Sequence, residues 1–275
     1  MSNIFQELQM VANASAVNTV EASRKQLNEI VNYFKQRSDY SENQEWFAKL
    51  RNLKTSILNE ADGFFIDESV KIFDIPQELR HDSLGLCKGS DILYSGRYVY
   101  PVKDVKGDVM GWCGYDKFED IKYLDSINYG YKANNSTYYG MEKMREYYSS
   151  NKPVFFVEGI VCCNWLRQEG FQSLASLGSY LSPYMITIAQ RLGDRAIFIT
   201  DSDESGTKYR DQVKRTLPRA RSFQSIVAKD VDDSRQVVPD LAEDLRGFNR
   251  HFYRSKYFKW DTTYICTRIK IHLRS

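Results

Sequence analysis

The chain has 275 residues, of which 42% are hydrophobic, and its formal net charge is +2. This length and apolar content suffice for one large or two modest folded domains and exclude a wholly disordered chain. The near-neutral balance gives no overall attraction for a polyanion, so any nucleic-acid binding must come from local patches. The first twenty residues lack the apolar stretch of a signal peptide, and no run is long enough to span a bilayer. We therefore expect a cytoplasmic protein without a membrane partner.

The cysteines and histidines are too scattered for a zinc site. None of the five cysteines forms a Cys-x-x-Cys pair, and the three histidines stand far apart. A structural zinc ion needs four such ligands at close spacing. We expect neither structural zinc nor, without a secretion signal, a disulfide framework.

Residues 1–60 form a segment that is expected to be helical. Gly and Pro are absent from it, and apolar residues recur at roughly the period of a helix. A polar break at 37–41 divides the segment in two. Two amphipathic helices that pack on each other or on the next domain are the favoured interpretation, and a module that docks a partner is the alternative.

Residues 61–150 form a segment with strands. The runs 97–102 and 109–115 flank a turn rich in Gly and Asp, which predicts a β-hairpin. Tyrosines interleave with lysines along this segment, and such a surface suits the bases and phosphates of single-stranded nucleic acid. A β-sheet that buries its tyrosines explains the same composition, and composition alone slightly favours the sheet.

Residues 151–245 alternate strands with helices. Strands are predicted at 154–157, 173–176, 196–200 and 222–227, and helices at 161–169, 183–191 and 205–216. This order predicts an α/β fold with a mostly parallel sheet flanked by helices, preceded by an α+β basic subdomain and the N-terminal helices. The tail, 246–275, is basic and aromatic. It could bind a nucleic-acid backbone or form a solvated extension with a strand at 264–273.

Acidic residues follow two of the predicted strands. Glu158 comes directly after 154–157, and Asp201 and Asp203 come after 196–200. Side chains beyond the carboxyl ends of parallel strands face the crevice where open α/β sheets bind ligands. Carboxylates this close repel one another unless a cation lies between them, and hard oxygen ligands suit Mg²⁺ or Mn²⁺. The sequence thus predicts a divalent-metal site at this edge of the sheet.

Four motifs in this segment resemble those of the Toprim fold and, within it, of the catalytic core of bacterial-type (DnaG-like) DNA primases. In chain order they are Val157-Glu158-Gly159, Ala175-Ser176-Leu177-Gly178, Asp201-Ser202-Asp203-Glu204-Ser205-Gly206 and Lys229-Asp230-Val231-Asp232-Asp233. One such motif is weak, whereas four in order at proper spacing are specific. The resemblance implies five metal ligands: Glu158, Asp201, Asp203, Asp230 and Asp232. The first three are also the implied catalytic residues.

Upstream segments extend the resemblance to primases in particular, over residues 84–235. Gly96-Arg97-Tyr98-Val99-Tyr100-Pro101-Val102 is similar to a primase segment in which an arginine precedes a Phe-Pro strand, and Lys122-Tyr123-Leu124-Asp125-Ser126 is similar to its Lys-Tyr-Leu-Asn-Ser. Lys132 and the following Tyr138-Tyr139-Gly140-Met141 match a later lysine and Leu-Tyr-Gly-Leu. The resemblance implies that nucleotide and template are bound by Arg97, Lys122, Tyr123, Lys132 and Lys229.

The chain departs from the family's pattern at several points. Cys162 stands where an aspartate usually follows the glutamate by four residues, which bears on how many acids surround a second metal ion. Asp125 stands where asparagine is usual. The family's zinc module and helicase-binding domain have no counterpart in this sequence, so template choice and helicase coupling are expected to come from elsewhere. A phage-encoded or otherwise streamlined primase fits this shape.

The resemblance implies a DNA primase that makes short RNA primers on single-stranded DNA from ribonucleoside triphosphates. Two metal ions would clamp the attacking and leaving oxygens in the nucleotidyl transfer. Glu158 would complete the metal site or take the proton from the attacking hydroxyl. The implied partners are the template, the nucleotides and a replicative helicase or other replisome protein, at the nucleoid or the site of phage DNA replication.

Two other functions stay open. Toprim nucleases and RNA-processing phosphodiesterases share the acids, although the Arg97 and Lys122 segments favour a primase. A catalytically inactive replication subunit that binds single-stranded DNA is the other alternative, against which the intact acids argue. A Toprim topoisomerase is disfavoured, because the chain has no room for the domain that carries its tyrosine nucleophile.

Overall fold

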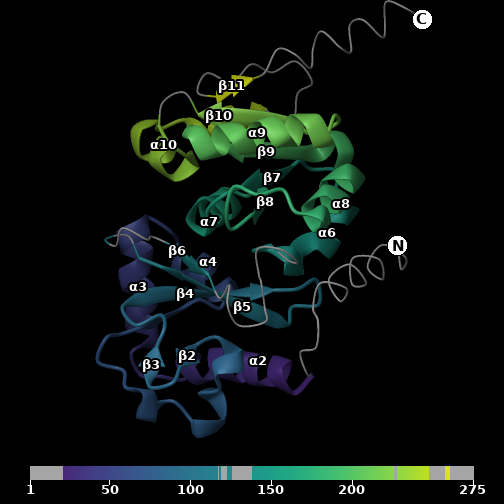
Figure 1. The fold of residues 1–275 in the computed structure, drawn as a ribbon. Helices are drawn as coiled ribbons and strands as arrows, with labels where there is room; N and C mark the ends of the chain where they lie inside the picture. The colour runs from purple at the N-terminus through teal and green to yellow at the C-terminus, as the bar shows by residue number, and fades with distance from the viewer. Residues whose placement is uncertain are drawn as a thin grey trace, which may run out of the picture.

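The computed structural model describes residues 21–116, 118, 123–125, 138–225, 228–247 and 258–260. Two sheets form two layers of the molecule, each with its own helices (Figure 1). Along the described ranges no helix has both the length and the apolar character that a membrane span requires. The predicted division into four segments is not tested by this arrangement and stays a prediction.

Three helices open the described chain: α2 (Glu21–Lys35), α3 (Tyr40–Arg51) and α4 (Thr55–Glu60). The predicted break at 37–41 is confirmed, since α2 ends before it and α3 begins at Tyr40. The second predicted helix is divided at Asn52, whose left-handed backbone (φ 48°) ends α3. Asparagine tolerates this conformation better than most residues, so the turn after α3 is encoded locally.

The first sheet is antiparallel, with the strand order β1-β4-β5-β6. Its strands are β1 (Phe64–Ile66), β4 (Arg97–Lys103), β5 (Val109–Tyr115) and β6 (Tyr123–Asp125). β4 and β5 form the predicted hairpin, with Tyr98 opposite Tyr115. In its turn, the Asp104 carboxylate accepts hydrogen bonds from the backbone N–H groups of Lys106 (2.8 Å) and Asp108 (3.1 Å). A two-stranded ribbon of β2 (Cys87–Lys88) and β3 (Asp91–Ile92) lies between β1 and β4 in the chain.

The tyrosines of this segment are core residues. Six of them are buried: Tyr94, Tyr98, Tyr100, Tyr115, Tyr138 and Tyr139. The Tyr98 ring stacks on the Phe47 ring of α3, with centroids 3.9 Å apart. The interpretation that the sheet buries its tyrosines is therefore confirmed for these six, and they provide no surface for stacking bases.

The second sheet has the strand order β11-β10-β9-β7-β8. Its strands are β7 (Val154–Val157), β8 (Gln172–Ala175), β9 (Ala196–Thr200), β10 (Arg221–Ser225) and β11 (Phe258–Trp260). β7, β8, β9 and β10 run parallel to one another, and β11 pairs antiparallel with β10 at the edge. The predicted mostly parallel sheet is confirmed. The predicted strand at 264–273 and most of the basic tail lie outside the described residues.

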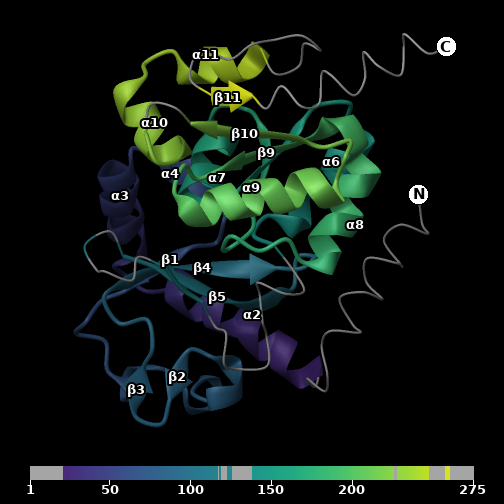
Figure 2. The ribbon, with the colours of Figure 1, turned by 45° about the horizontal axis from the view of Figure 1, so that its top comes forward.

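Helices cover both faces of this sheet (Figure 2). The helices are α6 (Met144–Ser149), α7 (Ile160–Gln168), α8 (Pro183–Leu192), α9 (Glu204–Thr216), α10 (Val231–Val237) and α11 (Leu241–Arg246). Successive residues of a strand face opposite sides, so Phe156 and Phe198 pack with α6, α8 and α9, whereas Phe155 and Ile197 pack with α7 and α11. The burial of both faces explains why the two central strands β7 and β9 are almost entirely apolar.

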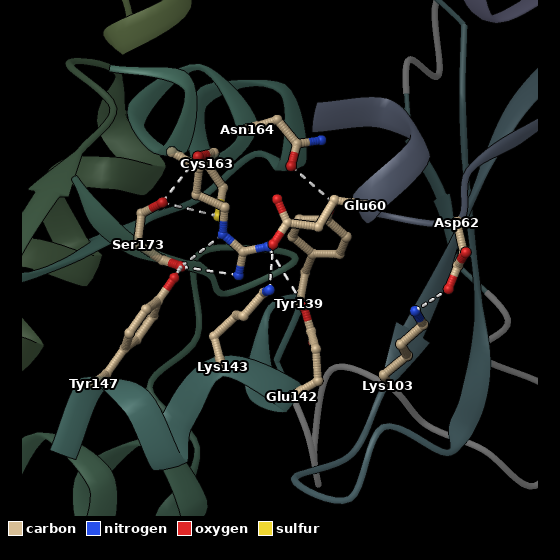
Figure 3. A network of polar contacts seen from close by, with 11 residues as sticks. Glu60, Asp62, Lys103, Tyr139, Glu142, Lys143, Tyr147, Cys163, Asn164 and Ser173 are labelled. Carbon is tan, nitrogen blue, oxygen red and sulfur yellow. Dashed lines mark hydrogen bonds and ion pairs between the residues drawn. The ribbon is translucent and has the colours of Figure 1, made fainter. Parts of the chain in front are cut away.

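One apolar core joins the two sheets. It contains Phe47 of α3 and Tyr100 of β4 together with Phe155 of β7 and Ile160 of α7. A polar network lies beside it (Figure 3): Lys143 pairs with Glu60, and Lys103 with Asp62. The first pair connects α4 to the turn before α6, in the layer of the parallel sheet, and the second connects the turn after α4 to β4 of the antiparallel sheet.

The same network encloses Arg167 of α7. Its guanidinium donates to the Ser173 carbonyl through Nη2 (3.2 Å), pairs with Glu142 (Nη1–Oε1 3.4 Å) and lies over the Tyr139 ring. A Cβ added at Gly140, which has φ of +100°, would collide with this guanidinium. Glycine is therefore required at position 140 for two reasons, backbone conformation and space.

We expect Gly140→Ala to destabilise the protein more than Gly107→Ala. Both glycines have a positive φ, 100° and 91°, but nothing lies within 4 Å of a Cβ at Gly107. Gly107→Ala should cost only the left-handed strain, about 1–2 kcal/mol. Gly140→Ala should cost about 1–3 kcal/mol more, because the Arg167 network must shift. Denaturant unfolding of the two variants measures the difference, and equal losses would show that the network adapts without cost.

Candidate active site

Three loops meet where the parallel strands end. Glu158 follows β7, Asp201 follows β9 and Lys229 follows β10. The Glu158 carboxylate accepts a hydrogen bond from the Asp201 N–H (Oε1–N 2.9 Å), and the Ser202 N–H donates to the Lys229 carbonyl (2.8 Å). Because these strands are adjacent and parallel, their carboxyl ends lie at one edge. The predicted convergence of the two acidic motifs is thus present.

The loop after β8 orients Glu158 from the other side. The Ser179 hydroxyl donates to Oε2 of Glu158 (2.5 Å), so each carboxylate oxygen has a donor. Backbone N–H groups of Ser176 and Leu177 donate to the carbonyls of Val157 (2.8 Å) and Glu158 (3.2 Å). Leu177 has φ of 58°, which is uncommon for a bulky residue and often found where function fixes the backbone. The Ala-Ser-Leu-Gly-Ser segment therefore acts as a support for the glutamate.

Asp203 begins the helix that follows β9. Its side chain caps α9 by accepting a hydrogen bond from the Gly206 N–H (2.8 Å). A Cβ at Gly206 would overlap the backbone of Asp201, so only glycine lets the helix start this close to the strand end. Asp201 and Asp203 are consequently presented together at the positive end of a thirteen-residue helix.

The two aspartates have opposite electrostatic environments. Burial and the nearby carboxylates of Glu158 and Asp230 raise the pKa of Asp201 to about 8, and Lys229 opposes the rise. The pKa of Asp203 is lowered by its hydrogen bond from the Gly206 N–H and by Lys229. Asp203 is thus ionised at neutral pH, whereas the surroundings of Asp201 favour its protonated, neutral form. A cation bound beside Asp201 would favour the ionised form instead.

Lys229 already places a cation between these aspartates. Its Nζ lies 3.2 Å from Oδ2 of Asp203 and 3.9 Å from Oδ2 of Asp201. Among the residues that the structure describes, no three His, Cys, Asp or Glu side chains are close enough to hold a metal ion by themselves. Mg²⁺ usually keeps several waters and takes only one or two protein carboxylates plus substrate phosphates. Two carboxylate oxygens converging on one ammonium fit such a mostly hydrated ion.

The remaining predicted metal ligands differ from each other. Asp230 caps α10 by accepting from the Asp233 N–H (2.8 Å), and it lies near enough to raise the pKa of Asp201. Asp232 is buried and paired with two arginines instead of facing the other acids. Arg51 of α3 pairs with its Oδ2, and Arg235 pairs with its Oδ1 (Nη2–Oδ1 2.6 Å). Burial and the adjacent Arg51 lower the pKa of Arg235 to about 10, which leaves it charged at neutral pH.

The predicted nucleotide- and template-binding residues are spread over both layers. Tyr123 of β6 lies under the glutamate turn, since a Cβ at Gly159 would be 3.0 Å from its hydroxyl. Arg97 is half-buried on β4, with its aliphatic stem beside Gly114. Lys122 and Lys132 lie outside the described residues. Of this set, the structure therefore brings Tyr123 and Lys229 to the acidic edge.

The chain is similar to curated DNA primases. It is 30% identical over 112 residues to a DNA primase of Borreliella burgdorferi, covering 40% of this chain and 21% of that protein. It is 28% identical over 185 residues to a DNA primase of Rickettsia felis, covering 66% of this chain and 30% of that protein. The chain thus spans less than a third of the length of these relatives. No protein-family model matches it.

Solved structures show the same arrangement of elements. A structure of the DnaG primase catalytic domain bound to single-stranded DNA aligns over 92% of this chain and 83% of its own length, with a TM-score of 0.70 and 16% identity. The catalytic core of the Escherichia coli primase aligns over 90% and 84%, with a TM-score of 0.64 and 18% identity. The chain folds as a bacterial-type, DnaG-like primase catalytic domain. The DnaG-like fold places Glu158 and Asp201 at the edge described above.

Sequence reasoning missed the residues that support this edge from a distance. Arg51 is 181 residues from Asp232, so no spacing rule connects them. Arg235 follows Asp232 by three residues on a helix, and that spacing could have indicated an ion pair. Ser179 directly follows the Ala-Ser-Leu-Gly motif, but its hydrogen bond to Glu158 depends on the parallel pairing of β7 with β8.

We expect Asp201→Asn to stabilise the metal-free protein at alkaline pH. The folded state holds the pKa of Asp201 at about 8, above the value of about 3.9 for an unfolded chain. Ionisation therefore costs folded-state stability progressively from about pH 4 to about pH 8. The advantage of the variant should grow over this range and shrink when Mg²⁺ is added. Urea unfolding at several pH values, with a chelator present, measures it.

Asp203→Ala is the matched control for this prediction. The pKa of Asp203 is lowered, so its ionised form stabilises the fold above its unfolded pKa. Loss of the cap should cost about 0.5–2 kcal/mol at neutral pH. An Asp201→Asn variant that is less stable than wild type at every pH would contradict the electrostatic assignment.

We expect Asp232→Asn to destabilise the protein strongly. It would leave the Arg51 and Arg235 guanidinium groups buried without their counterion, and such a loss costs about 3–5 kcal/mol. The control is Glu29→Gln, which removes an exposed pair with Lys25 on α2 and should cost less than about 0.5 kcal/mol. Thermal or denaturant unfolding compares them. A loss as small as that of the control would mean that the buried pair contributes nothing to stability.

Proposed function

We propose that the chain is the catalytic part of a DNA primase, which joins ribonucleotides into short primers on a single-stranded DNA template. The observation that carries the proposal is the meeting of Glu158, Asp201 and Lys229 at the ends of three adjacent parallel strands, within a DnaG-like fold. The similarity to curated DNA primases supports it. A related catalytic domain has been solved with single-stranded DNA, which supports the choice of template.

A divalent ion is the proposed cofactor, held by the carboxylates of Asp201 and Asp203. When bound, Mg²⁺ or Mn²⁺ would neutralise charge on the nucleotide phosphates. This charge must be neutralised while the 3′-oxygen bonds to the α-phosphorus and pyrophosphate leaves. Lys229 occupies this position in the absence of an ion, because its ammonium lies between the same two oxygens. With an ion held by these carboxylates, the Lys229 ammonium would be available to bind the nucleotide phosphates. Lysine is a common phosphate ligand in such sites.

Glu158 is proposed to act at the attacking 3′-hydroxyl. Its two carboxylate oxygens are held by the Asp201 N–H and the Ser179 hydroxyl, so its position is set before substrate binds. A carboxylate in a fixed position can orient a hydroxyl and accept its proton. The N-terminus of α9, capped by Asp203, adds a positive partial charge beside the leaving pyrophosphate. Positioning and charge neutralisation together account for most of the catalysis in phosphoryl transfer.

Template and partners follow from the same proposal. Arg97, Lys122 and Lys132 remain proposed contacts of the template or the incoming nucleotide. A replicative helicase or another replication protein remains a proposed partner.

We expect Asp201→Asn to reduce primer synthesis by about 10²–10³-fold, the usual effect of removing one electrostatic stabiliser of a transition state. Glu204→Gln is the control, because it also removes one negative charge from this loop. Its side chain is 84% exposed and pairs only with Lys208 among the contacts described, so synthesis should stay close to wild type. The assay uses single-stranded templates, labelled ribonucleotides and Mg²⁺ or Mn²⁺, with products separated on a sequencing gel.

The same gel separates the rival functions. Shortening of a labelled strand without any extension would favour a nuclease or an RNA-processing phosphodiesterase. Retention of the template with no change in any strand, under either metal, would favour a binding subunit. Equal primer yields from wild type and Asp201→Asn would contradict the assignment of Asp201 as a metal ligand.

A further inference from the structure

The Arg51–Asp232–Arg235 cluster is a buried ion triad at the interface of the two layers. Arg51 comes from α3 and the other two residues from α10, and the figures place these helices on the same side of the molecule (Figure 2). The three side chains are 6–8% exposed. Each oxygen of the Asp232 carboxylate is paired with a different guanidinium. The carboxylate that the sequence assigns to a metal ion is therefore already fully occupied by cations.

The triad is anchored in ways that oppose its opening. Arg235 also donates to two backbone carbonyls at the end of α3, those of Arg51 and Asn52 (Nη1–O 3.0 Å for Asn52). The Arg51 guanidinium lies over the Tyr115 ring, 5.2 Å from its centroid, and that of Arg235 lies over the Trp165 ring at 5.8 Å. Freeing Asp232 for a metal ion would break these contacts and bury two arginines without a counterion. Such a rearrangement is costly where the charged groups are buried.

The triad carries one net positive charge, from two arginines and one aspartate. One buried group, the Cys162 thiol, lies within the electrostatic influence of both clusters. Burial, Asp230 and Asp201 raise its pKa, and Arg235 and Arg51 lower it. This thiol is 5% exposed and occupies the position where an acid was expected. The acidic edge is thus bordered by a fixed positive charge and a neutral thiol instead of by further carboxylates.

We propose that the two guanidinium groups of Arg51 and Arg235 take the place of a second divalent ion, so that this chain binds a single ion, at Asp201 and Asp203. Two features support the proposal: the carboxylate of Asp232 is already paired with two guanidinium groups, and the side chain at position 162 is a thiol instead of a carboxylate. The inference deepens the proposed function, and it replaces the two-metal arrangement expected from the sequence. Arg51 and Arg235 are positioning residues, since they touch Asp232 and aromatic rings at the interface.

Counting bound Mn²⁺ tests the proposal without any catalytic assay. The free-ion signal in electron paramagnetic resonance falls as Mn²⁺ binds, so a titration of the full chain without nucleotide or template gives the number of ions. We expect one ion per wild-type chain, one in Asp232→Asn and none in Asp201→Asn. Asp230→Asn should also keep one ion. Asparagine caps helices about as well as aspartate, so this variant keeps α10 intact if Asp232→Asn fails to fold.

Two results would overturn the proposal: a wild-type count other than one, or the loss of an ion in Asp230→Asn or Asp232→Asn. Circular dichroism checks that each counted variant is folded. The wild-type count decides the question even if no variant folds. A chain that binds one ion and makes no primer would leave this inference intact and contradict the proposed function, so the two can fail separately.

Discussion

Mutual repulsion among carboxylates at one edge of a parallel sheet is the constraint on which this molecule depends. The fold brings Glu158, Asp201 and Asp230 together, and the repulsion is visible in the pKa of Asp201, which burial and its neighbours raise to about 8. Such an arrangement persists only when surrounding structure holds it in place. Hydrogen bonds to Glu158, the cap at Asp203 and the ammonium of Lys229 supply that support.

The rest of the chain can be understood as scaffolding for this edge. Parallel neighbours place the strand ends side by side, and Gly206 lets a helix begin against the backbone of Asp201. The antiparallel layer contributes Tyr123 beneath the glutamate turn and Tyr115 beside Arg51. Tyr98, Tyr100 and Tyr115 are buried in the core that joins the two layers, which is a structural use of residues that resemble a nucleic-acid surface in composition. Aromatic content alone cannot distinguish these two uses.

The sequence predicted what depends on local pattern and missed what depends on distant contact. The strands 154–157 and 196–200 were predicted with the bounds that the structure has, since apolar runs followed by acids mark buried strands of a parallel sheet. The division of the second N-terminal helix at Asn52 was missed, because apolar residues continue at helical spacing on both sides of it and outweighed the preference of asparagine for helix ends. The pairing of Asp232 with Arg51 was missed because the same Lys-Asp-x-Asp spacing serves either a metal or an ion pair. Only the fold decides between them.

The ion triad gives the N-terminal helices a function that does not require a docking partner. Arg51 is the last residue of α3, and its ion pair with Asp232 links α3 to α10. Asp230 is the N-cap of α10. Together with burial and Glu158, the charge of Asp230 in turn raises the pKa of Asp201. The contact at Arg51 is therefore connected to the acidic edge through α10 and Asp230. A metal ion at the same place would provide comparable charge but would come and go with substrate. Guanidinium groups are permanent, and they connect the two layers as well as neutralising the acid. The same two arginines thus neutralise Asp232 and stabilise the interface between the layers. A substitution that changes one of these effects also changes the other.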